Sequence, residues 1–382
     1  MPQVAYFDHA ASSPTLPEVI DAVFAQLGEA SANPSGTHRR ARAARRRVDE
    51  ARDTVAKVLG VEPGEVIWTS GGTEADNLAV FGAGALESNG QVVCSAIEHA
   101  AVLEPVRHLG GRTTAVDSRG LIDLDALASS LDEATRLVSV MAVNNEVGTI
   151  QPIEAVAGIV AARAPRAVFH VDAVQGLGWL DLSAVAALAD AVSISAHKVG
   201  GPQGVGALWL RAGMGPAPRA LGGGQERGRR SGTVPVALVA GATVAVELAA
   251  RRRDETVARV RRLRDRLADG LLAAVDGVVE TGVFDGDRAH KIAGNLHLCI
   301  DGVEGEALLY LLDEAGIAAS AAAACSSGAA APSHVLAAMG LVDGSRTAAL
   351  RLSLGPSTTD SDVDRVLDVL PAAVARLRTM GS

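Results

Sequence analysis

The feature that most limits the possible folds is an alternation of short apolar runs with helical patterns between Val66 and Leu210. The runs are rich in aliphatic side chains, as expected for strands buried on both faces. Several end in polar or glycine-rich turns, a pattern typical of an α/β domain with a mostly parallel sheet. Ligands bind such sheets at the carboxyl ends of the strands, so we expect the chemistry there. The predicted strands are Val66–Thr69, Gln91–Cys94, Leu137–Met141, Val168–Val171 and Ala191–Ile194.

The character of the chain changes near residue 250. A long Arg-rich helical pattern, from about Val236 to Val275, is followed by two strand patterns and two helical patterns in a different order. We therefore predict a large domain over residues 16–249 and a smaller α+β domain over residues 250–382. The later patterns are strands at Asn295–Ile300 and Ala349–Leu354, and helices near Gly305–Glu314 and Asp360–Arg378.

Charge and composition restrict the partners. The formal net charge is -9, and a surface of that sign repels phosphate backbones, so we expect no direct contact with nucleic acid. Asp8 and His9 interrupt any apolar leader, and the stretch Val234–Ala250 contains Thr243 and Glu247. These features predict a cytoplasmic protein with no membrane contact. Three scattered cysteines form neither a disulfide framework nor a metal site.

Lysine is scarce, since Lys57, Lys198 and Lys291 are the only three in the chain. Lys57 lies in a polar helical pattern and Lys291 in a predicted loop. Lys198 follows the strand that ends at Ile194, within a segment that continues into Gly200. A lysine needs a sheltered site to lose its proton and attack a carbonyl, and a strand end beside glycines provides one.

Asp172 ends the preceding predicted strand and is followed by Gln175. An isolated aspartate after a strand is usually a helix N-cap. With Lys198 one strand later, another interpretation is favoured: pyridoxal phosphate (PLP) needs a carboxylate to keep its pyridine nitrogen protonated. Gln175 would supply a neutral donor for the phenolic oxygen of the same ring.

Two further strand ends carry suitable groups. Ser70-Gly71-Gly72-Thr73-Glu74 opens a helix, where backbone N–H groups and the helix dipole can bind a phosphate. His99 follows the strand at Gln91–Cys94 and could stack on the cofactor ring or move protons. Each signal is weak alone, because glycines serve turns and histidines cap strands for purely structural reasons.

Cys325 lies in Ala321-Ala322-Ala323-Ala324-Cys325-Ser326-Ser327-Gly328, a segment of small residues with little to pack. We expect its thiol to be exposed and reactive. Cys94 and Cys299 fall in apolar strand patterns and are predicted to be inert core residues.

These residues, in this order, resemble the cysteine desulfurases of the NifS and IscS type, which are fold-type I PLP enzymes. The resemblance covers essentially the whole chain. Its motifs are Tyr6-Phe7-Asp8-His9-Ala10-Ala11, Asn33-Pro34-Ser35, Thr73-Glu74-Ala75-Asp76-Asn77-Leu78, Glu98-His99, Asn144-Asn145-Glu146-Val147-Gly148, Asp172-Ala173-Val174-Gln175, His197-Lys198, Gly222-Gly223-Gly224-Gln225-Glu226-Arg227, Arg230-Ser231-Gly232-Thr233, Cys325 and Arg351-Leu352-Ser353-Leu354-Gly355.

The resemblance implies a large domain with a mostly parallel seven-stranded sheet, flanked by helices, and an N-terminal segment (residues 1–15) that joins the small domain. It also implies roles for particular residues. Lys198 holds PLP, Cys325 accepts sulfur from L-cysteine as a persulfide, and His99 stacks on the ring. The implied cofactor contacts are Gly72, Thr73, Asp172, Gln175, Ser195, His197 and, from the other subunit of a homodimer, Thr233; the implied substrate contacts are Asn33, Asn145 and Arg351.

One departure from the family pattern precedes the cysteine, where Ala321–Ala324 replaces the usual Ser-Gly-Ser-Ala run. Losing the glycine stiffens the base of this loop. The resemblance implies no resident metal, although Cys325 could transiently ligate an iron–sulfur cluster. It also implies a sulfur-acceptor protein, which could serve iron–sulfur assembly, tRNA thiolation or DNA phosphorothioation.

The rival activities are a selenocysteine lyase, a small-amino-acid transaminase and a non-enzymatic scaffold or sulfur relay. A transaminase needs no thiol such as Cys325, and a scaffold needs no Lys198. A preference for selenocysteine stays open. The Arg-rich segment Arg39–Arg47 could receive an acidic partner, but its neighbours Asp49, Glu50 and Asp53 favour a solvated helix face.

Overall fold

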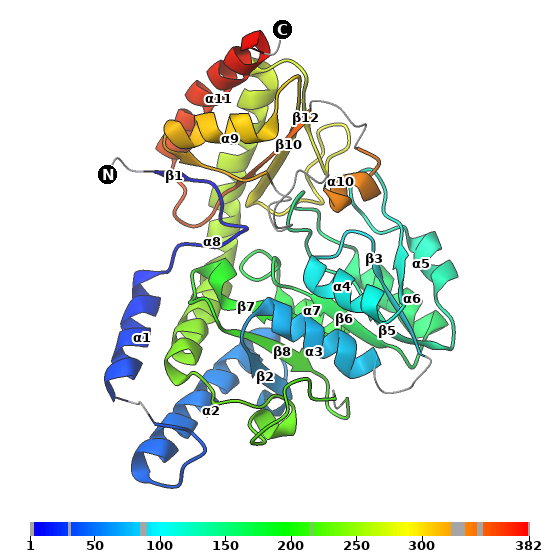
Figure 1. Ribbon diagram of the computed structural model, residues 1–382, viewed down its shortest axis with the longest axis vertical. Coiled ribbons are helices and arrows are strands. Elements are labelled where there is room, and N and C mark those ends of the chain that lie inside the picture. Colours follow the sequence, from blue (N-terminus) through cyan, green and yellow to red (C-terminus); the bar gives the residue numbers. More distant parts are fainter. Residues whose placement is uncertain are drawn as a thin grey trace.

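The computed structural model describes residues 4–29, 32–84, 90–214, 217–321, 333–341 and 347–380. Within these residues the largest sheet has seven strands in the order β2-β8-β7-β6-β5-β3-β4, which confirms the expected α/β fold (Figure 1). Its strands are β2 (Val66–Thr69), β3 (Gln91–Ser95), β4 (Arg112–Thr114), β5 (Thr135–Ser139), β6 (Val168–Asp172), β7 (Ala191–Ser195) and β8 (Gly206–Leu210).

The direction of the strands decides where the loops meet. Strands β4, β3, β5, β6 and β7 pair in parallel, and β8 is antiparallel to both of its neighbours, β7 and β2. Strand β2 therefore runs in the same direction as β7. As a result, the carboxyl ends of β2, β3, β5, β6 and β7 lie at one edge of the sheet.

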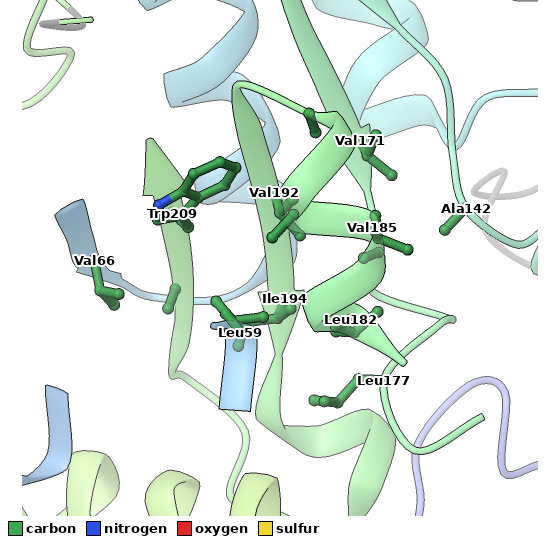
Figure 2. Close-up of a cluster of buried hydrophobic side chains, with 14 of the residues drawn as sticks. Leu59, Val66, Ala142, Val171, Leu177, Leu182, Val185, Val192, Ile194 and Trp209 are labelled. Atoms are coloured by element: carbon green, nitrogen blue, oxygen red, sulfur yellow. The ribbon is translucent and has the colours of Figure 1, made fainter. Parts of the chain in front are cut away.

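Both faces of the sheet are covered, because side chains alternate between two hydrophobic clusters. On strand β2, Val66 and Trp68 pack into one cluster and Ile67 packs into the other. The first cluster includes residues of α2 (Arg39–Leu59), α5 (Leu124–Ser130), α6 (Ile153–Arg163) and α7 (Leu182–Leu188), and Figure 2 shows part of it around Val192 and Ile194. The second includes residues of α3 (Gly72–Gly84) and α4 (Ala100–His108).

A separate hydrophobic cluster lies in the C-terminal part of the chain. There β10 (Asn295–Asp301) pairs antiparallel with β9 (Val278–Glu280) and β12 (Thr347–Ser353). The cluster includes residues of α9 (Gly305–Glu314) and α11 (Asp360–Met380), two helices drawn at the top of Figure 1. The small helix α10 (His334–Ala338) packs in a fourth cluster.

Helix α8 (Val236–Ala274) joins the two parts of the molecule (Figure 1). Its 39 residues extend for about 58 Å at 1.5 Å per residue. Val239 and Val246 pack in the cluster on the large sheet, whereas Leu263 and Leu271 pack in the C-terminal cluster. The division at residue 250 remains a proposal, and this change of partner along α8 supports it.

The N-terminal segment connects the same two parts. Strand β1 (Ala5–Tyr6) pairs in parallel with β11 (Ile317–Ala318), and Phe7 is fully buried in the C-terminal cluster. Helix α1 (Pro17–Glu29) then packs against α8. Residues 7–16 therefore cross between the two parts. In the described part of the chain, no helix is both long and apolar enough to cross a membrane.

Gly206 on β8 allows two backbone segments to lie in contact. A Cβ atom at this position would lie 2.7 Å from the carbonyl carbon of Gly71 and 2.7 Å from the carbonyl oxygen of Ile194. Gly71 immediately precedes α3, so this contact also sets where the N-terminus of α3 lies. A side chain at Gly206 would displace that N-terminus.

We therefore expect Gly206→Ala to lower the free energy of unfolding by about 1–3 kcal/mol, because either backbone segment could move away only by disturbing the strand or helix that it belongs to. The matched control is Gly158→Ala on α6, where a Cβ atom would meet nothing within 4 Å. That substitution should raise the free energy of unfolding by about 0.5–1 kcal/mol, since alanine favours a helix. Urea unfolding of both variants tests the pair, and equal effects would contradict the proposed contact.

Candidate active site

The predicted site residues lie at the edge of the sheet where five strands end in the same direction. Ser70–Thr73 follows β2, His99 follows β3, Asn145 follows β5, Asp172 ends β6, and Lys198 follows β7. The sequence separates these groups by up to 128 positions. Parallel pairing brings them to one edge.

Lys198 lies in the 3-10 turn η2 (Ala196–Val199), directly after β7. Its Nζ donates hydrogen bonds to the carbonyl oxygens of Ala10 at 2.7 Å and Ala11 at 2.9 Å. The other two lysines are placed differently. Lys57 is exposed on α2, and Lys291 is fully buried with its Nζ 3.2 Å from Glu280 Oε1. Lys198 is therefore the lysine at the strand ends.

Asp172 is 5% exposed, and its Oδ1 accepts a hydrogen bond from the Val174 N–H at 2.9 Å. Burial raises the pKa of this carboxyl, whereas the bond from Val174 and the charges of His99 and Lys198 oppose the rise. A buried carboxyl of this kind is stabilised in its ionised form when a cation lies against it. The protonated pyridine nitrogen of PLP would be such a cation. Gln175 donates from Nε2 to the Ala10 carbonyl oxygen at 2.8 Å.

His99 caps the N-terminus of α4, because its Nδ1 accepts a hydrogen bond from the Ala101 N–H at 3.1 Å. That bond places the ring proton on Nε2. Burial lowers the pKa of His99, the Asp172 charge opposes this effect, and the Lys198 charge adds to it. His99 is therefore neutral near pH 7, with Nε2–H as a donor. His99 can therefore cap α4 through Nδ1 and still present its ring face and Nε2–H to a cofactor.

Of the residues predicted to bind phosphate, Gly72 and Thr73 begin α3, and Ser195 lies beside Gly72. A Cβ atom at Gly72 would lie 2.7 Å from Val174 Cγ2, so glycine is needed beside Val174, and it would lie in ordinary contact with Ser195 Cβ at 3.5 Å. The Ser195 Oγ is buried and has no hydrogen-bond partner among the described residues. Burial and the nearby Lys198 charge lower the pKa of His197 to about 4, which makes it a neutral donor. An unpaired hydroxyl beside a helix N-terminus fits a phosphate group.

Arg351 on β12 reaches the site from the C-terminal sheet. Its Nη1 donates to the Asn145 carbonyl oxygen at 2.9 Å, and its Nη2 donates to Asp8 Oδ1 at 2.9 Å. Asn33 and Thr233 are exposed. In the described ranges, no hydrogen bond connects either of them to the other predicted site residues. The Asn33 Oδ1 instead accepts the Ser35 N–H at 2.9 Å.

A buried polar layer beneath Asp172 was not predicted from the sequence. Asp76 on α3 and Glu98 are almost fully buried, and burial raises the pKa of both carboxyls well above the usual range, with the Asp172 charge adding to it. His170 Nε2 lies 3.6 Å from Asp76 Oδ1. The motif Thr73–Leu78 contains Asp76 and was the available signal. Its position on a helix did not reveal that the side chain points into the sheet.

The predicted sulfur acceptor, Cys325, lies outside the described residues. The other two cysteines are described. Cys94 on β3 is buried, and burial raises its thiol pKa. Cys299 on β10 is partly buried, and burial raises its thiol pKa to about 11. Neither thiol ionises readily near neutral pH.

The fold is that of a fold-type I enzyme that uses PLP, and comparisons with known proteins agree. The aminotransferase class-V family model matches residues 5–366. An IscS-like cysteine desulfurase of Mycobacterium tuberculosis (strain ATCC 25618 / H37Rv) is 45% identical over 390 aligned positions, covering 98% of this chain and 97% of that protein. The cysteine desulfurase IscS 1 of Archaeoglobus fulgidus is 38% identical, with 98% of each chain covered.

Solved structures show the same likeness. A NifS-like protein superposes with a TM-score of 0.90 at 35% identity, covering 98% of this chain and 100% of its own. SspA in complex with cysteine superposes with a TM-score of 0.76 at 30% identity, covering 93% and 99%. The chain belongs to the class-V aminotransferase family, and within that family its activity is that of a PLP-dependent cysteine desulfurase.

The buried polar residues include His170, which should make the free energy of unfolding depend on pH. The His170 ring is held between the Ser139 Oγ at 2.8 Å and the Ser193 Oγ at 2.9 Å, and burial lowers its pKa to about 3. The unfolded chain binds a proton at this histidine below about pH 6.5, but the folded chain does not until about pH 3. Stability from His170 is therefore present above pH 6.5 and is lost as the pH falls.

From pH 7 to pH 5, the wild type should lose about 2 kcal/mol more unfolding free energy than His170→Asn. Urea unfolding at both pH values measures this difference of differences, so any constant destabilisation by the substitution cancels. His290→Asn, at an exposed position, is the control and should track the wild type. Parallel pH profiles for wild type and His170→Asn would show that the buried ring becomes protonated in the folded protein.

Proposed function

We propose that the strand-end residues hold PLP and L-cysteine in this desulfurase and that Cys325 takes the sulfur. The observation that carries the proposal is the convergence of Lys198, Asp172 and His99 at the ends of β7, β6 and β3. The Lys198 charge acts to lower the pKa of both Asp172 and His99, and these two groups also shift each other's pKa. Such mutual perturbation in a sheltered site is typical of catalytic groups.

In this proposal the cofactor is held at three points. Lys198 Nζ would hold it covalently. Asp172 and Gln175 would face the ring, and Gly72, Thr73, Ser195 and His197 would bind its phosphate at the N-terminus of α3. When bound, PLP supplies an electron sink that makes the protons and bonds next to the substrate α-carbon labile.

The chain's own groups supply positioning and proton transfer. Arg351 and Asn145 would hold the substrate α-carboxylate and so orient the α-carbon, with Asn33 as a further contact. Lys198 Nζ would take and return the proton at that carbon. The neutral His99 would stack on the ring and present its Nε2–H to the reacting region.

The overall transfer balances with one thiol of the protein. The bond between the β-carbon and sulfur of L-cysteine breaks, and a sulfur–sulfur bond forms at Cys325. The products are L-alanine and a Cys325 persulfide, with no outside oxidant. The attacking species is the thiolate, so Cys325 must lose its proton before it attacks.

We also infer a homodimer and a protein sulfur acceptor. Thr233 precedes α8 and is exposed, as expected of a residue that completes the phosphate site of the partner subunit. The acceptor would take sulfur from Cys325 for iron–sulfur assembly or nucleic-acid thio-modification, and we place the reaction in the cytoplasm. The structure of the similar protein SspA is a complex with cysteine, which supports cysteine as the substrate here.

Lys198→Ala should abolish both the visible absorbance of lysine-bound cofactor and sulfide release from L-cysteine. The reason is that no other described lysine lies at the strand ends. Lys57→Ala, at an exposed position on α2, is the matched control and should retain both signals. A lysine-bound absorbance band in Lys198→Ala would refute the assignment.

Cys325→Ser should retain cofactor binding but lose persulfide formation, because a hydroxyl is not ionised at neutral pH and is a poor sulfur nucleophile. Wild-type protein treated with L-cysteine and no reductant should gain one sulfur atom on the peptide that contains Cys325. Mass spectrometry of the digested protein measures this gain. Cys299→Ser is the control and should gain sulfur like the wild type, and sulfur on Cys94 or Cys299 instead would contradict the role of Cys325.

A further inference from the structure

We propose that Asp8 is a positioning residue for substrate binding, because its carboxylate holds the Arg351 guanidinium in place. The inference rests on the proposed role of Arg351 as the carboxylate site. Asp8 Oδ1 accepts a hydrogen bond from Arg351 Nη2 at 2.9 Å. The two side chains are 25% and 5% exposed respectively, so the ion pair is largely sheltered from water.

The surroundings of Arg351 leave Asp8 as its counter-charge. Among the described residues, Asp8 is the acid that forms an ion pair with Arg351. On the paired strand, His297 lies directly across from Arg351 and is fully buried. Burial, Lys291 and Arg351 together lower the pKa of His297 to about 3, so the imidazole is neutral and neither repels nor balances the guanidinium charge. A buried guanidinium without Asp8 would be uncompensated and would move toward water.

Hydrogen bonds fix the backbone around Asp8. Its carboxylate therefore has a set position and can hold the Arg351 guanidinium there. The Phe7 N–H donates to the Ala318 carbonyl oxygen at 2.8 Å, and the Ser353 N–H donates to the Phe7 carbonyl oxygen at 2.7 Å. Asp8 also forms a bridge with Ser353, two residues after Arg351. The acid and the arginine are therefore anchored to the same strand.

The Arg351 guanidinium has enough N–H donors to bind a substrate carboxylate as well as Asp8. Each terminal nitrogen of arginine carries two hydrogens. One on Nη1 is directed to the Asn145 carbonyl oxygen, and one on Nη2 to Asp8. Among the described residues, the second hydrogen on each terminal nitrogen has no acceptor, and two such hydrogens are the number that a bidentate carboxylate requires. Asp8 thus aligns the group without using the donors that bind the substrate.

The test is a split between KM and kcat. Asp8→Ala should raise the KM for L-cysteine by about tenfold or more, since a charge-assisted hydrogen bond that aligns the binding group is lost. The kcat should stay within about twofold, because the bond acts equally on bound substrate and transition state. Asp8→Asn retains an oxygen that can accept the Nη2 hydrogen, so its KM should rise much less.

Two measurements exclude a merely structural effect. L-Alanine carries the same α-carboxylate as L-cysteine but no sulfur. Its dissociation constant, measured by calorimetry on the holoenzyme, should rise in Asp8→Ala by a factor similar to the rise in KM. Sodium formate should partly restore the KM of Asp8→Ala by supplying a carboxylate beside Nη2. The control is Asp360→Ala, which removes an aspartate paired with Arg262 on the surface and should leave every value unchanged.

An unchanged or lower KM in Asp8→Ala would overturn the inference, because Asp8 would then be idle or a competitor of the substrate. If Asp8→Ala fails to fold, Asp8→Ser carries the same expectation, since its short side chain offers no anion to Nη2. Failure of the proposed function looks different. In that case Arg351→Ala would itself leave the KM for L-cysteine and the affinity for L-alanine unaffected.

Discussion

Parallel pairing of strands β3, β5, β6 and β7 is the constraint on which the rest of the molecule depends. It places the last residues of separate strands at one edge, and the two antiparallel pairings of β8 bring β2 to the same edge. A parallel sheet must be covered on both faces, so the helices that connect its strands exclude water from its interior. The side chains at the strand ends are therefore also shielded from water.

Dehydration then determines the charge state of the site. Asp172, Asp76 and Glu98 have raised pKa values, and His99, His170 and His197 have lowered ones, with burial as the largest cause in every case. Groups of both kinds therefore favour their neutral forms until an opposite charge arrives. The cationic ring nitrogen and the anionic phosphate of PLP would be opposite charges of this kind.

The N-terminal segment ties this site to the rest of the chain. Within a few residues it pairs with the C-terminal sheet through Asp8, and its Ala10 and Ala11 carbonyl oxygens accept hydrogen bonds from Lys198 and Gln175. Long helix α8 makes the same connection on a larger scale. Arg351 and Lys198, which come from β12 of one sheet and the end of β7 of another, are both held by these few N-terminal residues.

Local sequence determined much of this protein: five strands of the large sheet and two of the C-terminal sheet, the helix α8 pattern, and Lys198, Asp172 and His99 as strand-end groups. Strand boundaries shifted by a few residues, as at Met141, because local periodicity does not show where pairing stops. The tertiary structure alone decided that Asp8 pairs with Arg351, 343 positions away, and that the buried Asp76 lies near enough for the Asp172 charge to raise its pKa. Such contacts depend on how sheets and helices pack in three dimensions, and no spacing along the chain encodes them.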